Sequence, residues 1–144
     1  MEKITIEQAI EQNGYHLSTI VGDSMMPLLR NRRDMVKVVA PPERLKKYDL
    51  PLYKRPSGEY VLHRVVKVKK NHYIICGDNR FWREKVPFEW IVGIVDSVFR
   101  DETEIPVTDP GYVAYVKKTC RTFWPRRIKS KIKKILKNKK MLAI

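Results

Sequence analysis

The sequence predicts a mainly β protein, in which an antiparallel, barrel-like β domain follows a short helix and precedes a basic helical tail. Short runs rich in Val, Ile and Tyr recur at a spacing of roughly 8–12 residues, as in many β-barrels. Clusters of Gly, Pro, Asn and Asp separate these runs, and little helical periodicity lies between them. A length of 144 residues suits one domain with a core of its own. These features together indicate an antiparallel, barrel-like sheet.

One short helix is expected in the N-terminal segment, residues 1–15. Thr5 and Gln8 have the spacing of a capping box, in which each side chain accepts a hydrogen bond from the backbone of the other. Asn13-Gly14 is a stop signal, because glycine readily adopts the left-handed conformation that ends many helices. We therefore expect a helix over residues 6–13.

The β domain is expected over residues 16–105. Two turns, Ser57-Gly58 and Lys70-Asn71, each separate two strand-like runs and so predict hairpins. The longest apolar run, residues 90–95, has the length of a strand and falls far short of the ~20 apolar residues that span a bilayer. Strands are expected at residues 16–21, 35–39, 48–54, 60–69, 73–76 and 91–100.

Positive charge is concentrated in a C-terminal tail. The formal net charge is +14, yet 12 of the 30 Lys and Arg residues lie from residue 112 onward, with no Asp or Glu among them. Residues 1–111 therefore hold 18 basic and 16 acidic side chains and are almost neutral. A proline-rich linker over residues 106–111 is expected to join the β domain to this tail, residues 112–144.

The tail has the pattern of a basic amphipathic helix, with Pro125 well placed as its first residue. Such a helix is typical of proteins that lie on an anionic membrane surface, here through residues 124–142. A solvated tail and a nucleic-acid-binding tail are the alternatives, and nucleic acid is the less expected partner. The apolar residues that share one face are Ile128, Ile132, Ile135, Leu136 and Leu142.

Cysteine usage and the N-terminus give little sign of export. Two cysteines, Cys76 in an apolar run and Cys120 in the tail, form neither a disulfide framework nor a metal-ligand cluster, and we expect Cys76 to be buried. We expect no metal and no cofactor. Residues 1–5 lack the charged-then-apolar order of a secretory signal. A location in the cytoplasm, or peripherally on a membrane, without a transmembrane span, is therefore expected.

Ser24 and His63 are the candidate catalytic residues. A serine hydroxyl is a weak nucleophile near neutral pH and needs a base close by to take its proton. Histidine suits that role because its ordinary pKa, about 6.5, lets it accept and return a proton near neutrality. Gly22 and Pro27 flank the serine and predict a sharp turn that would hold its side chain out of the sheet. The structural alternative is a strand-to-loop connection in which Ser24 only caps the turn.

The segments around these residues resemble successive sequence boxes of the signal peptidase superfamily, which also includes the self-cleaving repressors of the SOS response. The resemblance covers about residues 17–100 and implies the family's β fold and serine endopeptidase activity on an extended peptide. It is nearest to the histidine-type signal peptidases of archaea and the endoplasmic reticulum, but without a transmembrane anchor. The matching segments are Gly22-Asp23-Ser24-Met25-Met26-Pro27 with Asp34, Tyr48-Asp49-Leu50, His63-Arg64-Val65, Gly77-Asp78-Asn79 and Ile91-Val92-Gly93.

The resemblance implies a role for each site residue. Ser24 corresponds to the nucleophile, and His63 stands where the bacterial enzymes carry a lysine base. A histidine base benefits from a carboxylate that orients it. Asp78 is the preferred candidate for that carboxylate and Glu84 the alternative, although either could be a turn-forming or ion-paired residue. Met25 and Pro27, beside the nucleophile, are expected to contact the peptide substrate.

Two neighbours of these residues have other expected roles. Arg64 is expected to face away from His63 and to form a structural ion pair, because adjacent strand residues point to opposite sides. Gly22 stands where bacterial enzymes have a hydroxyl that helps to bind the oxyanion, so the oxyanion is expected to rely on the Ser24 N–H and one other donor. Regulatory self-cleavage is an alternative function. A non-catalytic β domain whose basic tail binds membrane or nucleic acid is another.

Overall fold

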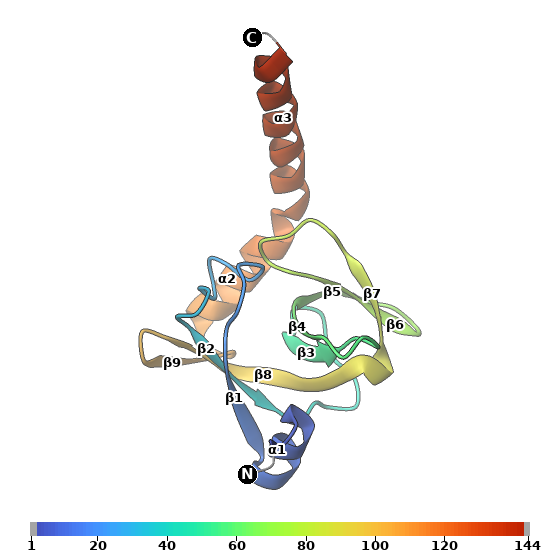
Figure 1. The fold of residues 1–144 in the computed structure, drawn as a ribbon, viewed down its shortest axis with the longest axis vertical. Coiled ribbons are helices and arrows are strands. Elements are labelled where there is room, and N and C mark those ends of the chain that lie inside the picture. The colour runs from blue at the N-terminus through green and yellow to red at the C-terminus, as the bar shows by residue number, and fades with distance from the viewer. Residues whose placement is uncertain (1–2, 143–144) are drawn as a thin grey trace.

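The computed structural model describes residues 3–142. Its strands form a curled β body, with one helix before the strands and two after them (Figure 1). The helices are α1 (Ile6–Asn13), α2 (Pro110–Arg121) and α3 (Phe123–Leu142), with a short 3-10 turn at Phe88–Trp90. The strands are β1 (Tyr15–Thr19), β2 (Met35–Val39), β3 (Pro51–Lys54), β4 (Tyr60–Leu62), β5 (Arg64–Val68), β6 (His72–Cys76), β7 (Glu84–Pro87), β8 (Ile91–Arg100) and β9 (Thr103–Pro106).

Helix α1 has the predicted bounds and the predicted caps. The Gln8 N–H donates to the Thr5 hydroxyl over 3.1 Å, and the Thr5 N–H donates to the Gln8 side chain over 2.8 Å. Gly14 ends the helix with a φ of 84°, in the left-handed region where a side chain would be strained. Ala9 and Ile10 are buried. Local caps therefore set the two ends of this helix, and the burial of Ala9 and Ile10 holds it against the sheet.

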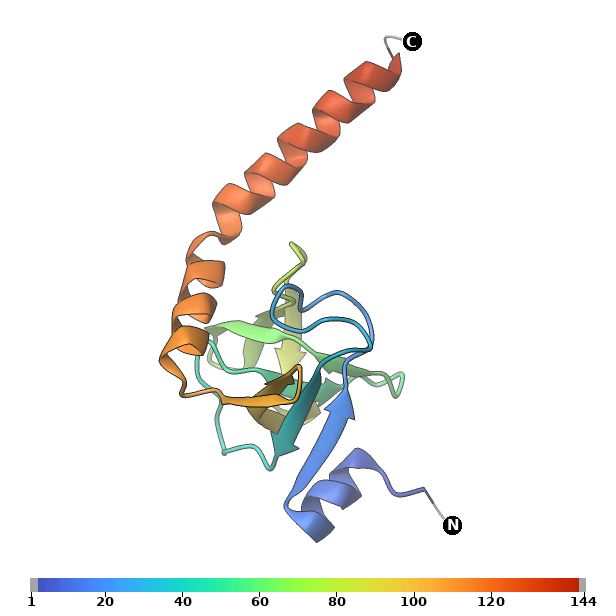
Figure 2. The same ribbon diagram turned by 90° about the vertical axis from the view of Figure 1, so that its left-hand side faces the viewer.

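The strands form a six-stranded and a three-stranded antiparallel sheet. The larger sheet has the order β1-β2-β8-β3-β4, and β9 pairs with β8 beside this path. The smaller sheet has the order β5-β6-β7. The larger sheet curls into a half-barrel (Figures 1 and 2). The prediction of a mainly antiparallel, barrel-like β fold is confirmed.

Two apolar clusters hold these sheets together. The larger cluster lies inside the curled sheet and includes Leu29, Val38 and Val98. Helix α2 closes one side of it, since Tyr112 and Val116 belong to the same cluster. The smaller cluster lies between the two sheets and is built from Leu45, Tyr53, Val61, Val65, Tyr73, Ile75 and Val86. Cys76 is buried as expected, and both cysteines are free.

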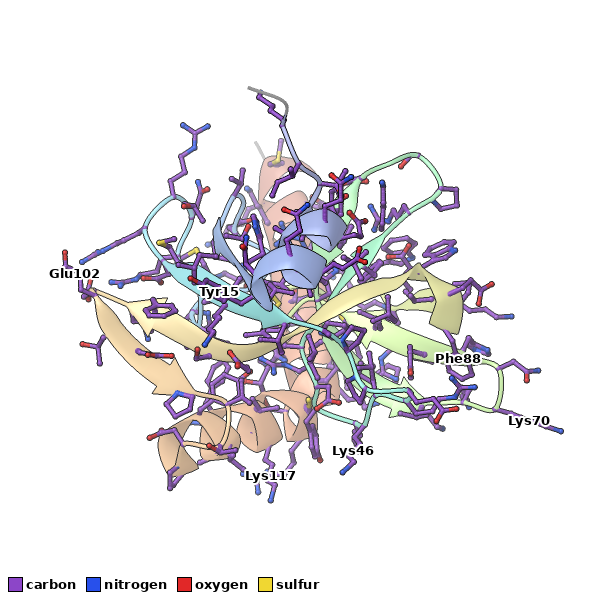
Figure 3. All side chains as sticks on the ribbon, turned by 90° about the horizontal axis from the view of Figure 1, so that it is seen from below. Tyr15, Lys46, Lys70, Phe88, Glu102 and Lys117 are labelled. Atoms are coloured by element: carbon purple, nitrogen blue, oxygen red, sulfur yellow. The ribbon has the colours of Figure 1, made fainter. Side chains whose placement is uncertain are left out.

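The predicted strand over residues 60–69 is in fact two strands in different sheets. Strand β4 pairs with β3, whereas β5 pairs with β6, and His63 lies at the corner between them. The hairpin turns at Ser57-Gly58 and Lys70-Asn71 join the strands as predicted. Strands β7 and β9 were not predicted, because their charged, Thr and Pro residues give no apolar alternation. Figure 3 shows the tips of two hairpins, at Glu102 and Lys70, on opposite sides of the body.

The segment expected as a linker, residues 106–111, contains the end of β9 and the start of α2. The Asp109 side chain accepts a hydrogen bond from the Tyr112 N–H over 3.1 Å, and Pro110 is the first residue of the helix. Both are preferred helix-start features. Helix α3 begins at Phe123, two residues before Pro125, and leads away from the β body (Figures 1 and 2). Among residues 3–142, no helix is both long and apolar enough to cross a membrane.

Candidate active site

Ser24 lies in a loop between β1 and β2 whose two ends are tied together. The Ile20 N–H donates to the Asp34 carbonyl over 2.9 Å, and the Arg32 N–H donates to the Ile20 carbonyl over 2.7 Å. The fully buried carboxylate of Asp34 accepts hydrogen bonds from the backbone and guanidinium of Arg30 over 2.7–2.9 Å. These bonds hold the two ends of the loop together beneath Ser24.

Inside the loop, apolar side chains hold Ser24 in place. Met25, Leu28 and Leu29 are buried in the main core, while Ser24 itself remains partly exposed. Gly22 has a φ of 95°, and this left-handed conformation lets the chain turn sharply just before the serine. The backbone N–H of Ser24 donates no hydrogen bond within the described residues. It is therefore available to an oxyanion beside the hydroxyl.

Gly77 brings Ser24 and His63 together. A Cβ added at Gly77 would lie 2.8 Å from the Ser24 carbonyl oxygen and 3.2 Å from Cδ2 of the His63 ring. These two atoms are thus no more than about 6 Å apart, the sum of the two distances. The Asn79 N–H also donates to the Ser24 carbonyl over 2.8 Å, which ties the Gly77-Asp78-Asn79 turn to the serine loop. Only glycine allows so close an approach at this point.

Ser24 and His63 also line one groove of about 300 Å³. Its two sides are β1, through Ser18 and Thr19, and β4, residues 60–62. Each of these strands is an edge of the larger sheet, so its outer backbone groups have no strand partner among residues 3–142. Core side chains such as Val38 form the apolar floor. Within the described residues, no hydrogen bond joins the Ser24 hydroxyl directly to the His63 ring.

The carboxylate of Asp78 is engaged on the other side of this turn. Its two oxygens accept hydrogen bonds from Arg64 over 2.8 and 3.1 Å, and Tyr115 donates a third over 3.0 Å. Arg64 also donates to the Tyr48 carbonyl and the Tyr112 hydroxyl. The side chains of Arg64 and Asp78 are each 1% exposed, so this ion pair is buried. Arg64 thus has the structural ion-pairing role expected for it.

The charge of Glu84 influences the pKa of His63 more than the charge of Asp78 does. No hydrogen bond joins Glu84 to His63 among the described residues. Glu84 accepts hydrogen bonds from the Tyr53 hydroxyl over 2.7 Å and from Arg55 over 2.8 and 3.0 Å. Burial alone would raise the pKa of Glu84, but the bonds from Arg55 and Tyr53 lower it below its usual value. The Tyr53 ring meets the His63 ring edge-on at 6.5 Å between centroids. Glu84, Tyr53 and His63 therefore form one cluster.

His63 is neutral at physiological pH. Burial is the main cause that lowers its pKa, and the positive charge of Arg55 lowers it further, to about 4. Glu84 acts in the opposite direction, more strongly than Asp78 does. A neutral imidazole has a free lone pair, which is the state required of a general base.

The low pKa of His63 predicts a loss of stability in acid. The unfolded chain binds a proton at this side chain below about pH 6.5, whereas the folded protein does so only below about pH 4. The free energy of unfolding should therefore fall by about 3 kcal/mol between these two pH values from this group alone. Urea unfolding from pH 7 to pH 4 should show a smaller fall for His63→Gln than for the natural protein. If the free energy of unfolding fell equally in both proteins, the low pKa of His63 would be contradicted.

The other expected site residues are divided between this groove and other surfaces. Met25 lines the groove, and its sulfur accepts a hydrogen bond from the Asp78 N–H over 3.3 Å. Pro27 is exposed and lines a separate cavity. Sequence reasoning missed Arg55 and Tyr53, because their place beside His63 depends on strand pairing. Gly77 stood in a recognised box, but its close packing could only be seen in three dimensions.

Residues 3–142 contain no group of three or more His, Cys, Asp or Glu side chains arranged to hold a metal ion. No protein-family model matches the chain, and no curated protein matches it. We therefore infer the function from the geometry of the groove and from the sequence resemblance.

Proposed function

We propose that the protein is a serine endopeptidase in which Ser24 is the nucleophile and His63 the general base. The Ser24 oxygen attacks the carbonyl carbon of a peptide bond, while His63 takes the hydroxyl proton. The proton then passes to the leaving amine as the C–N bond breaks, which leaves an ester on Ser24. Water, activated by the same imidazole, hydrolyses that ester. The free Ser24 N–H supports this proposal, since it can stabilise the oxyanion.

Glu84 is the carboxylate that we assign to the support of His63. Its charge favours the imidazolium that forms during the reaction, and it is the largest influence raising the pKa of that ring. Asp78 is committed to Arg64 and Tyr115. We assign Asp78 a positioning role, because its turn contacts both Met25 and the Ser24 carbonyl through backbone N–H groups.

The groove between β1 and β4 is the proposed substrate site. An extended peptide placed there can pair with the free backbone edges of both strands, as in β-strand addition. Side chains of such a peptide alternate between the apolar floor and solvent. The family resemblance implies small side chains just before the cut. The substrate is then a leader or signal-like segment that is extended when it binds.

The close approach of Ser24 and His63 around Gly77 is the observation that carries this proposal, and peptide cleavage tests it. Incubating the protein with a mixture of unstructured peptides should give defined cleavage products, identified by mass spectrometry. Ser24→Ala should abolish the products while the unfolding midpoint stays the same. Ser130→Ala, which removes an exposed hydroxyl in α3 outside the groove, is the matched control and should still cleave. Cleavage by Ser24→Ala at the natural rate would refute the assignment.

A further inference from the structure

Helix α3 carries an apolar stripe that the rest of the chain leaves uncovered. Trp124, Ile128, Ile132, Ile135 and Leu136 are each 52–57% exposed. Their spacing of three and four residues places them on one side of the helix, at 100° per residue. Phe123 and Arg126, which contact the β body, lie on the other side by the same spacing. From Ile128 onward the stripe therefore faces away from the body, whereas the ring of Trp124, at its start, lies 5.3 Å from the Arg83 guanidinium.

Positive charge dominates the remaining surface of α3. The helix holds nine Lys and Arg residues and no Asp or Glu. Like charges stand four residues apart at Arg127 and Lys131, Lys129 and Lys133, and Lys133 and Lys137, and such pairs destabilise an isolated helix. No described carboxylate forms a salt bridge with α3. A partner that neutralises the charge and covers the stripe would stabilise the helix.

Only the root of α3 is anchored to the body. Phe123 is buried, and its ring lies 6.0 Å from the ring of Phe81. The Arg83 guanidinium lies 4.3 Å from the centre of the Phe123 ring. Arg126 donates to the Asp78 carbonyl over 3.2 Å. Beyond this root the helix extends free of the β body (Figures 1 and 2). The apolar stripe and the positive charges are thus both exposed on a helix that projects from the β body.

We propose that α3 docks on the surface of an anionic lipid bilayer. Its Ile and Leu side chains enter the boundary between headgroups and acyl chains, and its lysines contact anionic headgroups. Trp124, at the start of the stripe, has the amphipathic ring that favours this interface. A nucleic acid would use the same cations, but its phosphates offer nothing to cover the apolar stripe. The apolar stripe therefore favours a lipid bilayer over a nucleic acid as the partner.

The cationic surface continues from the root of α3 onto the body. A cavity of about 950 Å³ lies there, bordered by Phe123, Trp124 and several basic side chains. Among residues 3–142, none of these basic side chains forms a salt bridge with a carboxylate. Lys117, which α2 contributes to this border, points outward from the helix in Figure 3. The basic residues are Lys47, Lys67, Arg83, Lys117, Arg121 and Arg126.

Vesicle flotation of the full chain tests the proposal. We expect binding to vesicles of equal parts phosphatidylcholine and phosphatidylglycerol, and none to phosphatidylcholine alone. Removing the charges of Lys131 and Lys134 by substitution with glutamine should weaken binding about fivefold per residue. Replacing Ile128, Ile132 and Ile135 together by serine, at unchanged charge, should weaken it by about tenfold or more. Ile4→Ser with Leu17→Ser, which removes exposed apolar side chains outside both α3 and this cavity, is the control and should bind normally.

Three results would overturn the proposal. One is no binding to the anionic vesicles. Another is equal binding by the triple isoleucine variant, which would mean attraction by charge alone. The third is tighter binding to a random-sequence oligonucleotide than to the vesicles. The substituted side chains are exposed, so the unfolding midpoint should not change. None of these readouts involves Ser24, and the lipid proposal and the peptidase proposal can therefore fail separately.

Discussion

Replacing His63 by alanine is expected to lower kcat by about 10²–10⁴-fold, the range typical for removal of a general acid–base group. The serine hydroxyl would then have to lose its proton to water. Folding should survive, because His63 lies at a corner between two strands and is only partly buried. His72→Ala, in β6 and outside the groove, is the control and should keep full activity. A His63→Ala enzyme as active as the natural one would exclude the proposed base.

The pH profile of kcat/KM distinguishes a base from a merely structural histidine. Its acid limb should follow the pKa of His63, at about 4. Arg55 lowers this pKa, so Arg55→Gln should move the limb to higher pH. Glu84 raises it, so Glu84→Gln should move the limb to lower pH. A limb that both variants leave in place would contradict the cluster of Glu84, Tyr53 and His63.

Asp78→Asn is expected to cost about 3–5 kcal/mol in the free energy of unfolding, because it leaves the buried guanidinium of Arg64 without its counter-ion. The substitution keeps the size of the side chain, so the loss in the free energy of unfolding measures the effect of removing the charge. Urea unfolding at neutral pH measures it. Asp23→Asn breaks a pair with Arg80 in which both side chains are about half exposed, and it should have little effect.

A double-mutant cycle shows whether Arg64 is the partner that matters. Arg64→Met combined with Asp78→Asn should destabilise the protein by less than the sum of the two single changes, since neither then leaves an unpaired charge. If the destabilisation of the double variant equalled the sum of the two single changes, an energetic coupling between Arg64 and Asp78 would be contradicted. Loss of peptidase activity in Asp78→Asn, at temperatures where it remains folded, would fit the positioning role of its turn.

The elements predicted correctly are those with local causes. Helix α1 has its caps within its own sequence, and β2 and β8 are rich in Val and Ile, with observed bounds equal to the predicted ones. The break at His63 could not be seen, because residues 60–69 are one continuous run rich in Val, and the chain changes sheets only in three dimensions. Strands β7 and β9 form through pairing with β6 and β8, not through their own propensity.

The same division applies to the site. Ser24, His63 and the Gly77 turn were recognised as sequence boxes, and the structure places the Ser24 backbone carbonyl and the His63 ring next to Gly77. Arg64 was expected to form an ion pair, but its partner lies 14 residues away and the tyrosines around it, Tyr112 and Tyr115, come from α2. No local signal marks such contacts between distant segments. Arg55, which lowers the pKa of His63, was hidden for the same reason.

The most direct test of the central claim is covalent labelling by a fluorophosphonate, which reacts with a serine that an adjacent base activates. Peptide mapping by mass spectrometry after treatment near neutral pH should find one adduct, on Ser24. It should be absent from Ser24→Ala and should form much more slowly in His63→Ala. No adduct, or adducts spread equally over exposed serines such as Ser57 and Ser130, would show that Ser24 is not an activated nucleophile.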